Sequence, residues 1–154
     1  MWIKHENTAI KTDALCPTHI PHIRWLDVTN SVKQFLARTK AKNGLCSITI
    51  KHSTARLILQ ENETGLVEHD IPVTLMRLFP EGEYRHDRPE RLAEMTGEPK
   101  NAPSHLRSLF FSQNVTFPIV GGEIDLGTWT QVLFFDFDPT SHKERLLTYF
   151  FMGE

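Results

Sequence analysis

A chain of 154 residues is long enough for one ordinary domain and too short for two. Charged residues make up 23% of it and hydrophobic residues 40%, which excludes wholesale disorder. A formal net charge of −2 lacks the basic excess of a dedicated nucleic-acid-binding protein. We therefore expect a single domain over residues 1–154 that does not bind nucleic acid.

The longest strongly apolar stretches, Leu109–Phe111 and Val132–Phe135, fall far short of the ~20 residues that a membrane-spanning helix needs. The first ten residues include Lys4, His5 and Glu6, so no apolar signal-peptide region is present. The two cysteines form neither a disulfide framework nor a CxxC motif. These features predict a cytoplasmic protein with no membrane partner.

The first predicted elements are strand-like segments at Met1–Ile10 and His22–Thr29, which mix β-branched and polar residues without helical periodicity. Ser31-Val-Lys-Gln34 then has the spacing of a capping box and predicts the start of a helix. We expect that helix to end at Asn43-Gly44, where glycine tolerates a left-handed conformation.

The next strand region, Leu45–Gln60, contains a break in its alternation. Apolar residues occupy even positions up to Ile50 and odd positions from Ala55 onward. Because strand side chains alternate faces with a period of two, the inward face must change between positions 52 and 55. A bulge or sharp bend would produce this change and would place His52 at a candidate site.

Two more helices are predicted in the second half of the chain. One covers Asp70–Phe79, with Asp70 as the N-cap, and the other covers Ser104–Gln113, with Ser104 as the N-cap. Between them, Pro80–Pro103 holds 24 residues with four prolines, and a structureless connection of this length is usually functional or disordered.

A hairpin is predicted from Val115–Val120 through Gly121-Gly122 to Glu123–Asp138. Val132–Phe137 and Leu146–Met152 are apolar on both faces, which is typical of strands between layers or in a subunit contact. The whole pattern predicts an α+β fold: a mainly antiparallel, β-sandwich-like single domain with two or three helices.

Three histidines are the strongest candidates for chemistry: His52, His86 (followed by Asp87) and His105. Three imidazoles, or two with a carboxylate, can hold a divalent ion and leave one coordination position open. Their wide spacing matches no compact metal motif. The alternative is three unrelated histidines, with His86 simply paired to Asp87.

His105 has a second interpretation, because it follows the predicted N-cap Ser104. Free backbone N–H groups at a helix start attract phosphate, and Arg107 would add positive charge. The alternative is a solvated first-turn histidine.

Other polar motifs are weaker. Glu61-Asn-Glu63 offers paired carboxylates but is more often a solvated turn, and Thr128-Trp129 offers a hydroxyl and an aromatic wall but equally a core position. No phosphate-binding P-loop and no Rossmann fingerprint is present, so we expect no nucleotide cofactor.

Several short motifs occur in a fixed order over the last 110 residues: His52-Ser-Thr-Ala55, Glu61-Asn-Glu63, His69-Asp70, Tyr84-Arg-His-Asp87, Pro103-Ser-His105, Leu126-Gly-Thr-Trp129 and the ending Arg145-Leu-Leu-Thr-Tyr-Phe-Phe-Met-Gly-Glu154. Together they resemble the YjbQ family, often labelled secondary thiamine-phosphate synthase.

This resemblance implies a compact α+β fold that assembles as a homotrimer, with sites near the subunit boundaries. It also implies that His52, His86 and His105 share one pocket, with Asp70 and Glu61 nearby. Arg56, Phe111 and Thr130 depart from the family pattern, and they bear on the choice of ligand more than on the fold.

The leading hypothesis is an enzyme that joins a pyrimidine pyrophosphate to a thiazole phosphate. In it, His52, His86 and His105 hold a zinc, magnesium or manganese ion on the pyrophosphate. Ser104 and Arg107 would bind phosphate, and Thr128 and Trp129 would contact a ring. The first alternative is a metal-dependent hydrolase with Asp70 or Glu61 as base. The second is a non-catalytic trimeric protein that binds a metal or a small ligand.

Overall fold

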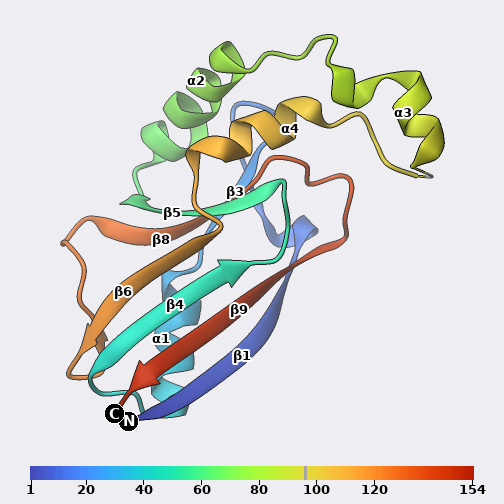
Figure 1. The fold of residues 1–154 in the computed structure, drawn as a ribbon. Coiled ribbons are helices and arrows are strands. Elements are labelled where there is room, and N and C mark those ends of the chain that lie inside the picture. The colour runs from blue at the N-terminus through green and yellow to red at the C-terminus, as the bar shows by residue number, and fades with distance from the viewer. Residues whose placement is uncertain (96) are drawn as a thin grey trace.

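The computed structural model describes residues 1–95 and 97–154, and within them it forms two antiparallel sheets and four α-helices. The strand orders are β1-β9-β4-β6-β7 and β2-β3-β8-β5 (Figure 1). The strands are β1 (Trp2–Lys11), β2 (Cys16–Pro17), β3 (Arg24–Asp27), β4 (Gly44–Ile50), β5 (Ala55–Glu61), β6 (Asn114–Val120), β7 (Glu123–Ile124), β8 (Thr130–Asp136) and β9 (Glu144–Gly153). The helices are α1 (Thr29–Thr39), α2 (Ile71–Leu78), α3 (Pro89–Glu94) and α4 (Ala102–Arg107).

The α+β class and the antiparallel, sandwich-like arrangement are confirmed. The helix count is larger than predicted, because α3 forms inside the connection that was expected to be structureless. Pro89 at the first turn of α3 fits a helix start, since its missing N–H would have no partner there anyway. The fold therefore gives the long connection a local structure of its own.

The main core lies between the two sheets and includes one face of α1. Phe35 of α1 stacks on Tyr149 of β9, with ring centroids 5.6 Å apart. On the other side of β8, a second core is formed with the segment around α2, and Leu75 of α2 and Phe135 of β8 belong to it. Figure 1 shows α2 and α4 covering this outer side of the second sheet.

Strand β8 lies between these two cores, which explains why it is apolar on both faces. Phe134 belongs to the core between the sheets, while Phe135 and Phe137 face the helices. Phe111 fills this second core, because its ring centroid lies 5.3 Å from that of Phe135 and 5.2 Å from that of Phe137. The prediction for β8 is confirmed.

The break in alternation after Ile50 is real, and its cause is larger than a bulge. β4 belongs to the first sheet and β5 to the second, so the chain crosses between the sheets at residues 51–54. Ile50 and Ala55 both lie fully buried, one on each side of this crossing. Each strand keeps its own inward face, and the crossing shifts the buried positions from even to odd residue numbers.

Helix boundaries differ from the predictions at both ends of α1, and the predicted cap of α2 is absent. Asp27 Oδ1 accepts the Thr29 N–H at 2.8 Å, so α1 begins before the capping box at Ser31. It ends at Lys40, which takes the left-handed conformation (φ 55°) in place of Gly44. Asp70 makes no capping hydrogen bond to α2 and pairs instead with His69, at 2.9 Å.

The Gly121-Gly122 turn is confirmed, and both glycines have positive φ. Its second strand is shorter than predicted, because β7 ends at Ile124 and the chain then crosses to the other sheet as β8. The predicted strand Glu123–Asp138 therefore divides between two sheets. None of the helices in the described part of the chain has the length and apolarity needed to cross a membrane.

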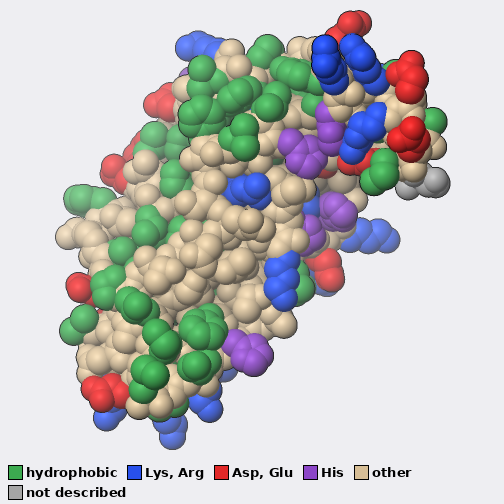
Figure 2. Space-filling view, in the orientation of Figure 1, with side chains coloured by type: hydrophobic (Ala, Val, Ile, Leu, Met, Phe, Trp, Pro, Cys, Tyr) green, Lys and Arg blue, Asp and Glu red, His purple; other side chains and the backbone are tan. Residues whose placement is uncertain are grey.

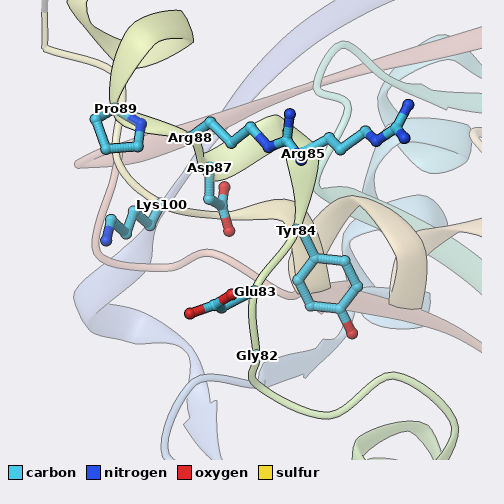
Figure 3. A pocket seen from close by; sticks show the side chains of 8 residues that line it. All are labelled: Gly82, Glu83, Tyr84, Arg85, Asp87, Arg88, Pro89 and Lys100. Carbon is cyan, nitrogen blue, oxygen red and sulfur yellow. The ribbon is translucent and has the colours of Figure 1, made fainter.

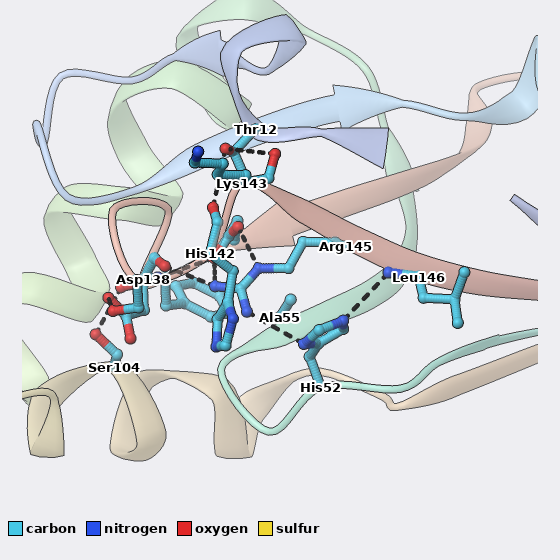
Figure 4. A network of polar contacts seen from close by, with 12 residues as sticks. Thr12, His52, Ala55, Ser104, Asp138, His142, Lys143, Arg145 and Leu146 are labelled. Carbon is cyan, nitrogen blue, oxygen red and sulfur yellow. Dashed lines mark hydrogen bonds and ion pairs between the residues drawn. The ribbon is translucent and has the colours of Figure 1, made fainter. Parts of the chain in front are cut away.

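A buried ion pair joins the two sheets. Arg145 at the start of β9 donates to both carboxylate oxygens of Asp136 at the end of β8, at 2.7 and 2.8 Å, and both side chains are fully buried. Arg145 also donates to the Asp138 carbonyl oxygen at 2.6 Å (Figure 4). The pair thus fixes the loop that links β8 to β9.

Breaking this pair from one side would leave a buried charge without its partner. We expect Asp136→Asn to lower the free energy of unfolding by about 3–5 kcal/mol, measured by urea denaturation. Glu6→Gln, which removes the exposed partner of Arg38, is the matched control and should change stability little. Equal effects of the two substitutions would contradict the role assigned to the buried pair.

Candidate functional site

Three metal-ligating side chains meet near the N-terminal end of α4. His86 lies on a 3₁₀ turn at Arg85–Asp87, Glu98 follows α3, and His105 lies on α4. One ligand atom from each of the three residues lies within 4.8 Å of the other two. All three side chains are half-buried, and we call them the His86–Glu98–His105 cluster.

The orientation of His86 is set by a neighbouring amide. Its Nε2 lies 3.1 Å from Asn101 Oδ1 and 3.7 Å from Glu98 Oε1. Asn101 presents its oxygen to His86 because its Nδ2 donates to Asp138 Oδ2 at 3.0 Å. Asn101 Oδ1 and Glu98 Oε1 therefore both face His86 Nε2. Two oxygen atoms and a ring nitrogen around one point are an arrangement that also suits a cation.

Asp87 holds the segment that presents Asn101. Its carboxylate accepts the Asn101 N–H at 3.0 Å and the Ala102 N–H at 3.1 Å, and so caps α4 from outside the helix. The suggested pairing of His86 with Asp87 is therefore replaced by a capping role. The helix begins at Ala102, so Ser104 is not its N-cap, which corrects that prediction.

The electrostatics of the cluster favour neutral imidazole and ionised carboxylate. Burial, together with the nearby charge of His86, lowers the pKa of His105 below its ordinary value. The contact with Arg91, whose Nη2 lies 2.8 Å from Glu98 Oε2, lowers the pKa of Glu98. Neutral imidazole and carboxylate are the forms that bind metal ions.

The donor set fits a divalent transition metal. Two imidazoles and a carboxylate form a mixed nitrogen and oxygen set, as zinc and related ions prefer, and a fourth position stays open for water or substrate. Asn101 Oδ1 faces the same ring nitrogen of His86 as Glu98 does, and Asp138 holds that amide in place, so the Asn101 oxygen lies on the side where an ion would bind.

His52 lies outside this cluster in the single chain. Its Nε2 faces the N–H of Leu146 at 3.2 Å, and its Nδ1 faces Arg145 Nη1 at 3.3 Å (Figure 4). His142 is its other aromatic neighbour, with ring centroids 5.5 Å apart. Because protein N–H groups face both ring nitrogens, His52 offers no lone pair to an ion in this conformation.

Ser104 and Arg107 connect α4 to the neighbouring segments of the fold. Ser104 is buried and donates to the Phe137 carbonyl oxygen at 2.6 Å. Arg107 is fully buried and donates to the Phe79 carbonyl oxygen and to Glu81 Oε1, at 2.7 and 2.8 Å. In the single chain these polar atoms tie α4 to its neighbours, and the phosphate role of the two residues stays a prediction.

Glu61, Thr128 and Trp129 lie at the other end of the second sheet. β5 pairs with β8 so that Ala55 is opposite Asp136 and Glu61 is opposite Thr130. Six strand residues separate these ends, or roughly 20 Å. Trp129 is 73% exposed and lines a hollow of about 380 Å³ together with Glu61.

Asp70 also lies outside the cluster. It pairs with His69, whose ring centroid is 4.9 Å from that of His19, and both Asp70 and His69 are exposed. The structure therefore brings two of the predicted residues together, His86 and His105, and in one chain it leaves the others elsewhere.

A hollow of about 580 Å³ adjoins the turn that carries His86 (Figure 3). Arg85, Arg88 and Lys100 line it, but in Figure 3 both arginine side chains extend to one side of the turn and Lys100 extends to the other. Its positive charges do not converge, so the hollow itself is a poor anion site.

Sequence reasoning missed Glu98 and Asn101. Asn101 precedes the Ala102-Pro103 helix start, where an amide side chain is common, and this position was a usable signal. Glu98 lies in a polar loop with no periodicity, and only the folded chain brings it to the histidines.

Comparison with known proteins places this architecture among relatives. A family model described as UPF0047 protein YjbQ-like matches residues 18–154. A UPF0047 protein of Archaeoglobus fulgidus is 32% identical over 114 residues, covering 73% of this chain and 80% of the relative. A UPF0047 protein of Methanothermobacter thermautotrophicus is 30% identical over 126 residues, covering 80% and 81%.

Solved structures agree over nearly the whole chain. A YbjQ-like protein of unknown function from Sulfolobus solfataricus aligns with a TM-score of 0.79 and 25% identity, covering 99% of both chains. A hypothetical protein from Aeropyrum pernix aligns with a TM-score of 0.76 and 28% identity, covering 98% of this chain and 99% of that one.

The surroundings of His52 make its protonation unfavourable. Burial comes first, and the charges of Arg145 and His142 add to it, so the pKa of His52 lies below its ordinary value of about 6.5. The unfolded chain then binds this proton at a higher pH than the folded chain, and stability falls as the pH drops below about 6.5.

We expect the NMR titration of the His52 ring to have its midpoint below 6.5. We also expect the free energy of unfolding to fall less steeply between pH 7 and pH 5 in His52→Gln, which cannot be protonated, than in the unsubstituted chain. A midpoint at or above 6.5 would show that burial and the neighbouring charges do not disfavour protonation of the ring as described.

Proposed function

The chain belongs to the YjbQ-like UPF0047 family, and its His86 and His105 side chains lie beside the Glu98 carboxylate. We propose that it is a metal-dependent enzyme acting on a small phosphorylated substrate. The observation that supports this most directly is the His86–Glu98–His105 cluster, with ligand atoms within 4.8 Å of one another. Joining a pyrimidine pyrophosphate to a thiazole phosphate is the specific reaction that the family resemblance indicates.

His86, Glu98 and His105 are the residues that would hold the ion. A divalent ion bound there would neutralise the charge on phosphate oxygens. The chain's own contribution is positioning: Asp87 fixes the start of α4, and Asn101 fixes the His86 ring. In a synthase of this kind the protein needs little covalent chemistry, since orientation of the two substrates and stabilisation of the leaving charge supply most of the acceleration.

No observation favours the hydrolase alternative in the single chain. Its two candidate bases are Asp70, which pairs with His69, and Glu61, which lies at the far end of β5. A non-catalytic metal-binding protein would use the same cluster, and it is distinguished by the absence of turnover with any phosphorylated substrate pair.

Metal binding is the first test. We expect the purified chain to bind about one Zn²⁺ or Mn²⁺ per protomer, as a single mononuclear site would. His105→Ala and Glu98→Gln should each lower that affinity at least tenfold, because each removes a ligand. Isothermal titration calorimetry measures this directly.

His5→Ala is the matched control, because His5 is an exposed residue of β1, and its metal affinity should stay unchanged. Equal affinity in His5→Ala and His105→Ala would rule out the cluster as the binding site. Turnover of the pyrimidine and thiazole substrates together, but of neither alone, would distinguish a synthase from a hydrolase.

A homotrimer is part of the same proposal. Trp129 and Glu61 lie too far along the sheet to meet the histidine cluster of their own chain, and the exposure of Trp129 leaves it available to a neighbouring copy. The outer face of β4 also presents Leu45, which is 45% exposed. A trimer would bring the two ends of the second sheet together at subunit boundaries.

We expect light scattering coupled to size-exclusion chromatography to give three times the mass of one chain. Trp129→Ala should reduce substrate turnover without changing the Zn²⁺ affinity of the cluster, since Trp129 is not a ligand. A monomeric mass would remove the route by which Trp129 and Glu61 reach the site.

A further inference from the structure

Arg56 lies on β5 and faces the layer of helices. Its neighbours Ala55 and Leu57 are fully buried in the core between the sheets, so Arg56 points to the opposite side of the strand. Its Nη1 donates to the His52 carbonyl oxygen at 2.7 Å and to the Ala55 carbonyl oxygen at 2.9 Å. These bonds fix one end of the guanidinium group against the backbone.

The other end of the same group is unused. Within residues 1–95 and 97–154, Nε and Nη2 of Arg56 have no hydrogen-bond acceptor, and no carboxylate lies within 4.0 Å of the guanidinium. The two fully buried arginines, Arg107 and Arg145, differ from Arg56 in that each contacts a carboxylate. The Nε and Nη2 donors of Arg56 are therefore available to an acceptor that reaches this face of β5.

Arg56 lies in the same part of the molecule as the His86–Glu98–His105 cluster. The Ser108 hydroxyl lies between the carbonyl oxygens of Ser53 and His105, at 3.0 and 2.7 Å, and so fastens the crossing before β5 to α4. The charge of Arg56 contributes to the lowered pKa of His105, after burial and His86. Figure 2 shows histidine side chains and basic side chains gathered on this part of the surface.

We propose that Arg56 binds a phosphoryl group of the substrate beside the His86–Glu98–His105 cluster, through its Nε and Nη2 atoms. This inference rests on the proposed function for the location of the reacting group. A guanidinium edge with two parallel N–H donors matches two oxygens of a phosphate or diphosphate. The two backbone acceptors at Nη1 hold that edge in place before the substrate arrives.

Arg56 is therefore assigned as a substrate-binding residue and not as a metal ligand. The ion and the arginine would act on different parts of the substrate. A metal ion would neutralise one part of a diphosphate, and the guanidinium would bind another part.

The test uses the full-length chain after removal of metal with a chelator, so that anion binding cannot occur through an ion. Calorimetric titration with inorganic pyrophosphate at pH 7 and low salt is compared for the unsubstituted chain, Arg56→Gln and Arg56→Lys. We expect Arg56→Gln to weaken binding at least tenfold and Arg56→Lys to weaken it less, because lysine keeps the charge but loses the planar pair of donors.

Arg38→Gln is the matched control, since Arg38 is an exposed arginine on α1, and its pyrophosphate affinity should stay unchanged. Zn²⁺ affinity is measured in parallel on the same variants and should be the same in Arg56→Gln as in the unsubstituted chain. Normal Zn²⁺ binding without any effect of Arg56→Gln on pyrophosphate would overturn this inference and leave the proposed function standing.

The converse result, pyrophosphate binding that depends on Arg56 in a chain without Zn²⁺ affinity, would support the anion site and overturn the metal site. A purely structural role predicts a lower melting temperature for Arg56→Gln with unchanged pyrophosphate affinity, which would also overturn the inference. If Arg56→Gln does not fold, Arg56→Lys decides the question by the same comparison.

Discussion

The buried pair of Asp136 and Arg145 is the interaction on which the rest of the structure depends. It joins the end of β8 to the start of β9, and these strands belong to different sheets. Two fully buried charges are tolerated because the contact is bidentate and because Arg145 has a further acceptor in the Asp138 carbonyl oxygen. The corner of the sandwich is therefore held by polar contacts.

The residues at this corner also position the side chains of the candidate site. Asp138 follows the pair along the chain and accepts the Asn101 amide, which in turn orients His86. Arg145 faces the His52 ring at the crossing between β4 and β5, and Arg56 lies just after that crossing. The connections between the sheets and the candidate site are thus parts of one hydrogen-bonded region.

The candidate site combines groups with distinct electrostatic roles. The cluster offers two imidazoles and a carboxylate, and the Asn101 amide oxygen lies beside it, which suits a cation. Arg56 offers a fixed guanidinium edge, which suits an anion. A small phosphorylated substrate with its metal ion carries both kinds of charge, and this complementarity is why the two proposals reinforce each other while depending on different residues.

The amino-acid sequence by itself determined the α+β class, the break after Ile50, the Gly121-Gly122 turn and the two-faced strand β8. It did so because each depends on local periodicity or on glycine conformation. His86 and His105 could also be singled out, as imidazoles in a connection of unusual length. The cap that Asp87 supplies to α4, the burial of Arg107 and the approach of Glu98 to the histidines were decided only by the tertiary structure. Each of these involves side chains that meet by folding, and no spacing along the chain encodes which distant partner a polar group will find.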